Sequence, residues 1–172
     1  MYHFRAPSAM WYHGGMESDR SARADALAFL KRHHTAVIAT AGHDNLPHAS
    51  AIHYYADDDF NVYFLTLPSS RKYKALAAHP QVAFTVVRED VPQTIQIEGM
   101  AKDISNALEM QEKKDRVMRV LNANPFFLPP ISKLDPEKPA VIWIRPTWIR
   151  WADYAFAQYG TDRVFKEIPI KE

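Results

Sequence analysis

The chain contains no cysteine among its 172 residues, and this absence excludes several classes of chemistry at once. Disulfide bridges, thiolate nucleophiles, cysteine-ligated zinc and iron–sulfur clusters all need cysteine. Glycine is also scarce, with 5 residues. The sequence holds no glycine-rich phosphate loop of the nucleotide-binding kind.

Long apolar runs and a strong net charge are absent as well. No run approaches the roughly 20 apolar residues of a membrane span, and residues 1–5 lack the apolar core of a signal peptide. The formal net charge is +1, so no overall basic field favours nucleic acid or a membrane surface. We therefore expect a cytoplasmic protein without a nucleic-acid or membrane partner.

What is present is typical of one globular domain, with 47% hydrophobic and 24% charged residues. Changes in hydrophobic period predict an irregular arm over 1–17, a domain over 18–155 and a tail over 156–172, with a polar stretch at 160–172. Predicted strands cover residues 35–41, 48–55, 60–67, 81–88, 94–104 and 140–153. One predicted helix begins at Ser18, and two others cover 69–79 and 105–122, the last with Ser105 as its N-cap. Residues 124–139 form a predicted proline-rich loop.

These elements predict a mainly β fold with peripheral helices, namely a small closed antiparallel barrel. Gly99 inside a strand indicates a bulge or a close backbone approach, and Pro146 indicates a bulge or an edge position. Strand periodicity places Trp148 on the face opposite Trp143 and Trp151.

One segment contradicts the usual charge preference of helix ends. Residues 69–74 read Ser-Ser-Arg-Lys-Tyr-Lys and open a predicted helix. A helix N-terminus carries partial positive charge, so each cation there is unfavourable by roughly 0.3–1 kcal/mol when exposed. A bound phosphate would reverse that sign by accepting bonds from backbone N–H groups, a serine hydroxyl and Arg71. A solvated basic surface is the alternative reading.

The position of this turn favours a ligand. It directly follows the aromatic strand segment at 62–66, so a molecule held by its phosphate would extend over the strand surface. Flavin mononucleotide (FMN) has the matching parts: a terminal phosphate, a polyol chain and an amphipathic tricycle.

These segments resemble the FMN-binding split barrels related to pyridoxamine 5′-phosphate oxidase, including the general stress protein branch. The likeness runs from about Ser18 to Asp153 and is sharpest where Thr66 is followed by Ser70-Arg71-Lys72 and then by His79-Pro80. The resemblance implies an antiparallel split barrel, FMN as cofactor, and a homodimer with the flavin at the interface.

The resemblance also implies the cofactor-binding residues. One strand contributes Ser50, Ala51, Ile52 and His53, with Ser50 in place of a frequent arginine. The phosphate turn and the strand before it contribute Leu65, Thr66, Ser70, Arg71 and Lys72. The position of a glutamine offered by the partner subunit falls at Thr94, with Gln96 nearby, and half of a late aromatic pair survives as Trp151.

The expected function is flavin-mediated hydride or electron transfer between an electron donor and a small molecule, so the chain is expected to be an FMN-dependent oxidoreductase. Residues 154–172 lack the Arg-x-His element that grips the substrate phosphate in the true oxidases, so pyridoxamine phosphate is not the expected substrate. Alternatives are a flavin-binding stress or sensor protein without turnover, the same barrel holding haem or a deazaflavin, and a single-strand nucleic-acid surface.

Other candidate sites fit structural roles better. Eight histidines invite a metal interpretation, but the odd spacing of His48 and His53 puts them on opposite strand faces, and we expect no metal site. The acidic run at 57–59 lacks the ligand spacing of a calcium loop and is interpreted as a turn. No residue is identified as a catalytic acid or base.

Overall fold

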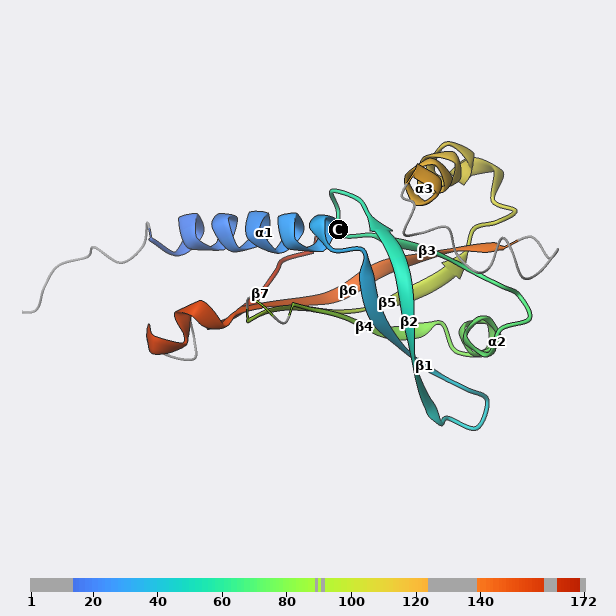
Figure 1. The fold of residues 1–172 in the computed structure, drawn as a ribbon, viewed down its shortest axis with the longest axis horizontal. Helices are drawn as coiled ribbons and strands as arrows, with labels where there is room; N and C mark the ends of the chain where they lie inside the picture. Colours follow the sequence, from blue (N-terminus) through green and yellow to red (C-terminus); the bar gives the residue numbers. More distant parts are fainter. Residues whose placement is uncertain (1–13, 89, 91, 124–138, 160–163, 171–172) are drawn as a thin grey trace, which may run out of the picture.

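The computed structural model describes residues 14–88, 90, 92–123, 139–159 and 164–170. In chain order its elements are α1 (Gly14–Arg32), β1 (Thr35–Ala41), β2 (Pro47–Ala56), β3 (Val62–Thr66), α2 (Arg71–Ala78), β4 (Gln81–Arg88), β5 (Gln93–Asp103), the 3₁₀ turn η1 (Leu108–Met110), α3 (Gln111–Ala123), β6 (Ala140–Asp153), the 3₁₀ helix η3 (Tyr154–Tyr159) and β7 (Phe165–Glu167). Figure 1 shows the strands in the middle of the molecule, with α1 at one end and α2 and α3 at the other.

The strands form one antiparallel sheet in the order β3-β2-β1-β4-β5-β6-β7. An additional pairing of β3 with β6, from Val62 opposite Ile144 to Thr66 opposite Ala140, closes the first six strands of this order into a barrel. The predicted mainly β, closed antiparallel fold is therefore confirmed. Strand β7 pairs with the far end of β6 and lies outside the closed barrel.

Alternation along the strands separates the core from the outer face. In β1, Ala36, Ile38 and Thr40 are buried, whereas Val37 on the other face is 45% exposed. Apolar side chains from all six barrel strands and from α1 form the main core. A second, smaller cluster around Tyr63 lies on the outer face, where α3 packs.

A bulge between β5 and β6 changes which tryptophans share a face. The register shifts between Glu98 and Gly99, and Gly99 lies opposite Pro146. A Cβ at Gly99 would lie 2.6 Å from the carbonyl oxygen of Arg145, so only glycine permits this close approach. The expected bulge at Gly99 and Pro146 is confirmed.

Because of this bulge, the prediction that Trp148 lies on the face opposite Trp143 is wrong, whereas its placement opposite Trp151 is confirmed. Trp143 and Trp148 both lie on the outer face. Trp143 packs against the cluster around Tyr63, and Trp148 lines a surface groove, whereas Trp151 lies in the main core. The extra residue of the bulge shifts the two-residue period between Trp143 and Trp148.

Three predicted boundaries also need correction. Helix α1 begins at Gly14, inside the expected arm, and α3 begins only at Gln111. Ser105 does not cap α3, because its hydroxyl accepts a hydrogen bond from the backbone N–H of Val141 at 2.9 Å. The expected polar tail contains β7 and the buried Ile168.

The predicted loop at 124–139 lies outside the described residues except for Pro139. Within the described part of the chain, every helix is too short or too polar to cross a membrane.

Candidate functional site

The turn between β3 and α2 is built by two hydroxyl side chains. Ser70 has extended backbone and caps α2, with its Oγ accepting a hydrogen bond from the backbone N–H of Tyr73 at 3.2 Å. The Oγ1 of Thr66, at the end of β3, lies 3.0 Å from the Ser70 Oγ. The sequence predicts this helix over 69–79. In the structure the helix begins at Arg71, because Ser70 is its N-cap.

The first turn of α2 carries cations and no acidic residue. Arg71 is exposed, and neither it nor Lys72 forms an ion pair with any described carboxylate. The Lys72 ammonium lies 5.5 Å from the ring centroid of the buried Phe64. Burial lowers the pKa of Lys72, because the charged form loses hydration there. The turn therefore holds positive charge that no described carboxylate neutralises.

Arg71 also contacts His48, a residue that the sequence does not predict as part of this site. The Arg71 Nη2 lies 2.9 Å from the His48 Nε2. His48 belongs to β2 and lies on the same strand face as Ser50, two residues later. That two-residue spacing was visible in the sequence. The approach of α2 was not, since 22 residues separate His48 and Arg71 in the chain.

Residues 50–53 alternate across β2 as a strand requires. Ser50 is half-buried and Ile52 is buried, whereas Ala51 and His53 are exposed on the other face. The prediction that His48 and His53 lie on opposite faces is confirmed. The His53 Nδ1 lies 3.3 Å from the hydroxyl of Thr35 in the neighbouring strand.

The other predicted contacts lie elsewhere in the chain. Thr94 and Gln96 belong to β5, and the Gln96 Oε1 accepts hydrogen bonds from Arg150 at 2.7 and 3.1 Å. Trp151 is 5% exposed and packs against Phe29 of α1, with ring centroids 4.9 Å apart. No described contact joins these three predicted residues to the first turn of α2. Leu65 is half-buried at the end of β3 and packs against the cluster around Tyr63.

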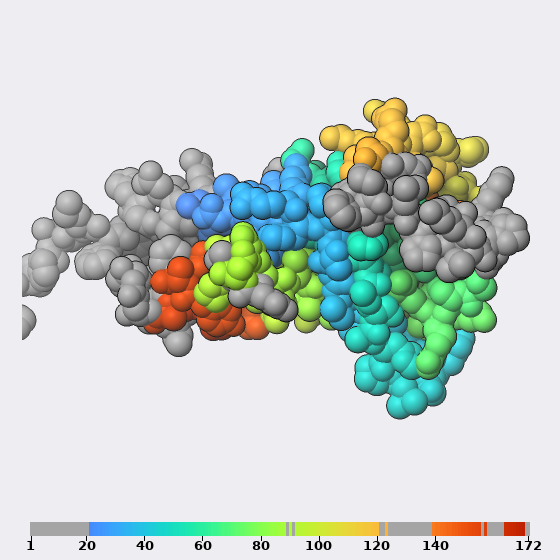
Figure 2. Space-filling model, in the orientation of Figure 1, coloured from blue at the N-terminus to red at the C-terminus, as the bar shows by residue number. Residues whose placement is uncertain are grey.

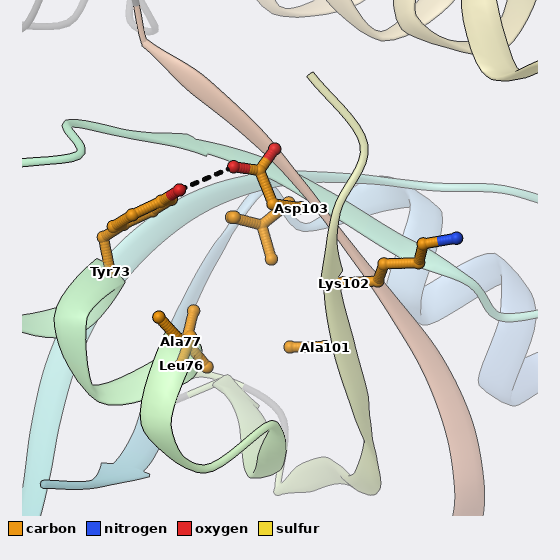
Figure 3. Close-up of a pocket in the computed structure, with 7 residues that line it drawn as sticks. Tyr73, Leu76, Ala77, Ala101, Lys102 and Asp103 are labelled. Atoms are coloured by element: carbon orange, nitrogen blue, oxygen red, sulfur yellow. Dashed lines mark hydrogen bonds between the residues drawn. The ribbon is translucent and has the colours of Figure 1, made fainter. Parts of the chain in front are cut away.

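A small cavity lies between α2, the end of β5 and the start of β6 (Figure 3). Its volume is about 60 Å³, far below the roughly 300–1,000 Å³ of pockets for organic ligands. In Figure 3 the Tyr73 hydroxyl points to Asp103, to whose Oδ2 it donates a hydrogen bond of 2.8 Å. This contact fixes α2 on the barrel and leaves its first turn at the surface.

A larger groove of about 280 Å³ lies on the outer face of the barrel. It is lined by Val37, Ala39, Ala83, Phe84, Thr85, Gln96, Ile97, Glu98 and Trp148. One of the predicted cofactor strands, β5, therefore lines this groove, and another, β2, pairs with its strand β1.

A second charged cluster, the Asp57 cluster, joins the β2–β3 turn to α3. The Asp57 carboxylate accepts hydrogen bonds from Lys113, Asn61 and the Tyr63 hydroxyl at 3.0–3.1 Å. Burial alone would raise the pKa of Asp57, but the hydrogen bonds from Lys113 and Asn61 hold it below its usual range. Asp57 also accepts the backbone N–H of Asp59, so the acidic run is a turn, as predicted.

The start of α2 suits a phosphate better than other ligands. Two hydroxyls, the free N–H groups of a helix end, a guanidinium and a half-buried ammonium are donors and positive charges without a described acid among them. A phosphate monoester supplies the matching acceptor oxygens and negative charge. The donor set thus fits the phosphate of a cofactor.

Comparisons with known proteins agree with this architecture. The family model described as pyridoxamine 5′-phosphate oxidase matches residues 22–151, which confirms the resemblance seen in the sequence. No curated protein matches the sequence at a significant level.

Solved structures share the fold at low identity. A conserved hypothetical protein of Mycobacterium tuberculosis, Rv2991, has a TM-score of 0.62 at 20% identity, covering 80% of this chain and 88% of its own. A putative pyridoxamine 5′-phosphate oxidase of Listeria innocua has a TM-score of 0.58 at 20% identity, with 75% and 96% covered. General Stress Protein 26 of Bacillus anthracis has a TM-score of 0.56 at 22% identity, with 83% and 96% covered.

Other matching structures differ in the ligand that they are named for. A FAD-binding protein of Mesorhizobium loti has a TM-score of 0.59 at 14% identity, with 73% of this chain and 88% of its own covered. An F420 reductase has a TM-score of 0.51 at 25% identity, with 71% and 93% covered. A haem-binding protein of Mycobacterium smegmatis has a TM-score of 0.61 at 16% identity, with 95% and 59% covered. The shared fold thus accommodates more than one class of ligand.

Proposed function

We propose that this chain, which belongs to the pyridoxamine 5′-phosphate oxidase family, binds FMN with the flavin phosphate at the start of α2. The observation that carries the proposal is the cationic first turn of α2. Ser70 caps the helix there, and Arg71 and Lys72 have no described carboxylate as a partner. Phosphate would accept the helix N–H groups and form charge-assisted hydrogen bonds with both cations.

The rest of the flavin would lie over the strands that lead into this turn. Thr66 ends β3 within hydrogen-bond distance of Ser70, so the polyol chain would begin there. Residues 50–53 of β2 would supply backbone groups and small side chains beside the ring.

We further propose a homodimer with the flavin at the subunit interface. Val37 and Val87 are 45% and 62% exposed on the outer barrel face, and an exposed apolar face of this kind suits a subunit contact. Thr94, Gln96 and Trp151 make no described contact with the α2 turn of their own chain. A second subunit is the arrangement that would bring Thr94 and Gln96 to the flavin, whereas Trp151, packed in the core against Phe29, would support the strand from inside.

Bound FMN would supply hydride or electron transfer, and the protein would bind and orient it. The cations of the α2 turn would hold the phosphate, and the β2 backbone would fix the ring position. The substrate class is a small conjugated or heteroaromatic molecule able to stack on the ring, with a separate electron donor. A flavin-binding stress or sensor protein without turnover is the second candidate, and the likeness to General Stress Protein 26 favours it.

Identification of the natural ligand tests the proposal. Protein purified from cells would be heated, and the released molecule identified by mass and by its absorption spectrum. FMN is the expected result. Haem, F420, FAD or the absence of any bound molecule after incubation with FMN would overturn the FMN proposal.

Turnover separates the enzyme from the sensor. Steady-state oxidation of NADH or NADPH by the FMN-loaded protein supports the oxidoreductase, and a lack of turnover with both donors supports the sensor. Sedimentation with and without FMN tests the homodimer, and a monomer in both states would refute it.

A further inference from the structure

A third hollow lies where the β2–β3 turn, the middle of β6 and the segment after β7 meet. Its volume is about 620 Å³, within the roughly 300–1,000 Å³ of pockets for organic ligands. Figure 1 shows the chain running from β7 toward the β2–β3 turn, and this course brings Ile170 to the hollow. The lining includes Asp59 and Asn61 of the turn, Trp143, Arg145 and Thr147 of β6, and Ile170. We call this hollow the Arg145 groove.

The indole of Trp143 forms a fixed wall of the Arg145 groove. Its Nε1 donates a hydrogen bond of 2.9 Å to the Oδ1 of Asn61, and the Asn61 amide nitrogen donates to both carboxylate oxygens of Asp57 at 3.1 Å. The indole is half-buried and packs against the cluster around Tyr63. Because its polar group already has a partner, the ring offers the groove a flat apolar surface.

Arg145 supplies the groove with a positive charge. It follows Trp143 by two residues in a stretch of β6 with regular register, so both side chains lie on the same strand face. Arg145 is exposed and forms no hydrogen bond or ion pair with another described residue. A guanidinium keeps its charge at every physiological pH and carries five N–H donors. These donors are therefore available to a ligand.

The bulge of β6 adds a hydroxyl next to this cation. Gly99 lies opposite Pro146 and permits the close approach of the Arg145 carbonyl oxygen, which fixes the backbone there. Thr147 is the extra residue of the bulge, because the next pair of β5 and β6 joins Glu98 to Trp148. The Thr147 side chain is exposed and lines the groove. Bulges often redirect a side chain beside a binding site.

This set of groups fits one class of small molecule. A carboxylate can accept two parallel hydrogen bonds from the Arg145 guanidinium and a further one from the Thr147 hydroxyl. An attached aromatic ring would have Trp143 and the half-buried Ile170 as apolar surfaces. Asp59 also lines the groove, and its carboxylate disfavours a second negative charge on the ligand. A monocarboxylate therefore fits better than a phosphate monoester.

We propose that the Arg145 groove is a second ligand site, separate from the α2 turn, which binds a small aromatic monocarboxylate. The carboxylate pairs with Arg145 and Thr147, and the aromatic ring lies against Trp143. This site goes beyond the proposed FMN function and does not depend on it.

The α2 turn and the Arg145 groove are separated by the length of β3. Thr66 ends β3 beside the α2 turn, whereas Asn61 directly precedes β3 and lines the groove. Five residues of a strand span roughly 16 Å. Figure 2 shows α2, in green, at the surface beside the projecting β1–β2 turn, in cyan. The two sites can therefore be occupied at the same time.

Titration calorimetry of the full chain with 2-naphthoate at neutral pH tests the proposal. The amide 2-naphthamide has nearly the same shape without the charge, so it is the control probe. Arg145→Gln removes the cation, and Arg119→Gln is the matched control, because it removes an exposed arginine of α3. Each titration is run with and without saturating FMN.

We expect one 2-naphthoate to bind per chain, about tenfold more tightly than 2-naphthamide, because only the acid forms a charge-assisted pair. Arg145→Gln should weaken 2-naphthoate binding about tenfold and leave 2-naphthamide unchanged. Arg119→Gln and added FMN should each leave the affinity for 2-naphthoate within about twofold.

A lack of 2-naphthoate binding, or equal affinity for it in the wild type and Arg145→Gln, would overturn the proposal. Displacement of 2-naphthoate by FMN would also overturn it, because the probe would then occupy the flavin site. If Arg145→Gln does not fold, Thr147→Glu decides, since its added carboxylate should abolish 2-naphthoate binding and unchanged binding would refute the site. Failure to bind FMN is a separate result that refutes only the proposed function.

Discussion

Two lysines lie over the two aromatic side chains that β3 presents to its opposite faces. Lys72 of α2 lies 5.5 Å from the ring centroid of Phe64, and Lys113 of α3 lies 5.3 Å from that of Tyr63. Lys113 also donates to Asp57 at 3.0 Å, whereas Lys72 has no described carboxylate as a partner.

The difference distinguishes a contact that stabilises the fold from a candidate binding site for an anion. Around Asp57, each donor meets an acceptor within one chain, so the cluster fastens α3 and the β2–β3 turn and needs no ligand. At the start of α2, the helix end, Arg71 and Lys72 add positive charge to positive charge. An arrangement that is unfavourable in the free protein becomes favourable when an anion binds.

The largest expected effect breaks the α2 side of this comparison. Arg71→Ala combined with Lys72→Ala should raise the dissociation constant of FMN about 100-fold, because two charge-assisted bonds of more than about 1.4 kcal/mol each are lost. Fluorescence quenching measures it. The matched control is Lys113→Ala with Arg116→Ala on α3, which should leave FMN affinity within about twofold. Equal losses in both double variants would contradict the placement of the phosphate.

A smaller effect sharpens the same comparison through stability. Lys113→Met should lower the free energy of unfolding by about 1 kcal/mol, because Asp57 loses a charged donor. Lys72→Met should leave it unchanged or raise it by about 0.5 kcal/mol, because a half-buried charge without an acidic partner is removed while the aliphatic stem stays on Phe64. Denaturant unfolding of the ligand-free protein measures both values, and a greater loss of stability in Lys72→Met than in Lys113→Met would contradict the difference between the two lysines.

The smallest effect concerns acid. The pKa of Asp57 is lower in the folded protein than its ordinary value of 3.8, so the unfolded chain binds more protons in the interval between the two values. The Asp57 contribution to stability is therefore complete above pH 3.8 and is lost as the pH falls through the folded pKa. Asp57→Asn should show a shallower loss of stability over that acidic range than the wild type. Parallel curves would show that Asp57 gains nothing from its donors.

Much of the fold follows from local pattern. Strand alternation and proline and glycine placement predicted β1, β4 and β6 with their observed bounds. Gly99 and Pro146 predicted the bulge, since glycine and proline have few other uses inside a strand. The same alternation failed across that bulge, because a single extra residue moves Trp148 to the face of Trp143.

The candidate site likewise has one part that the sequence predicts and another part that depends on the tertiary structure. The sequence by itself determined that a short helix begins near Ser69, with Arg71 and Lys72 in its first turn, directly after an aromatic strand, because hydrophobic period and turn chemistry are local properties. Only the tertiary structure decided that His48 accepts from Arg71 and that Lys113 pairs with Asp57, whereas Lys72 pairs with no carboxylate of the described residues. Those pairings depend on segments distant in sequence, which the closure of the barrel brings together and which no local period encodes.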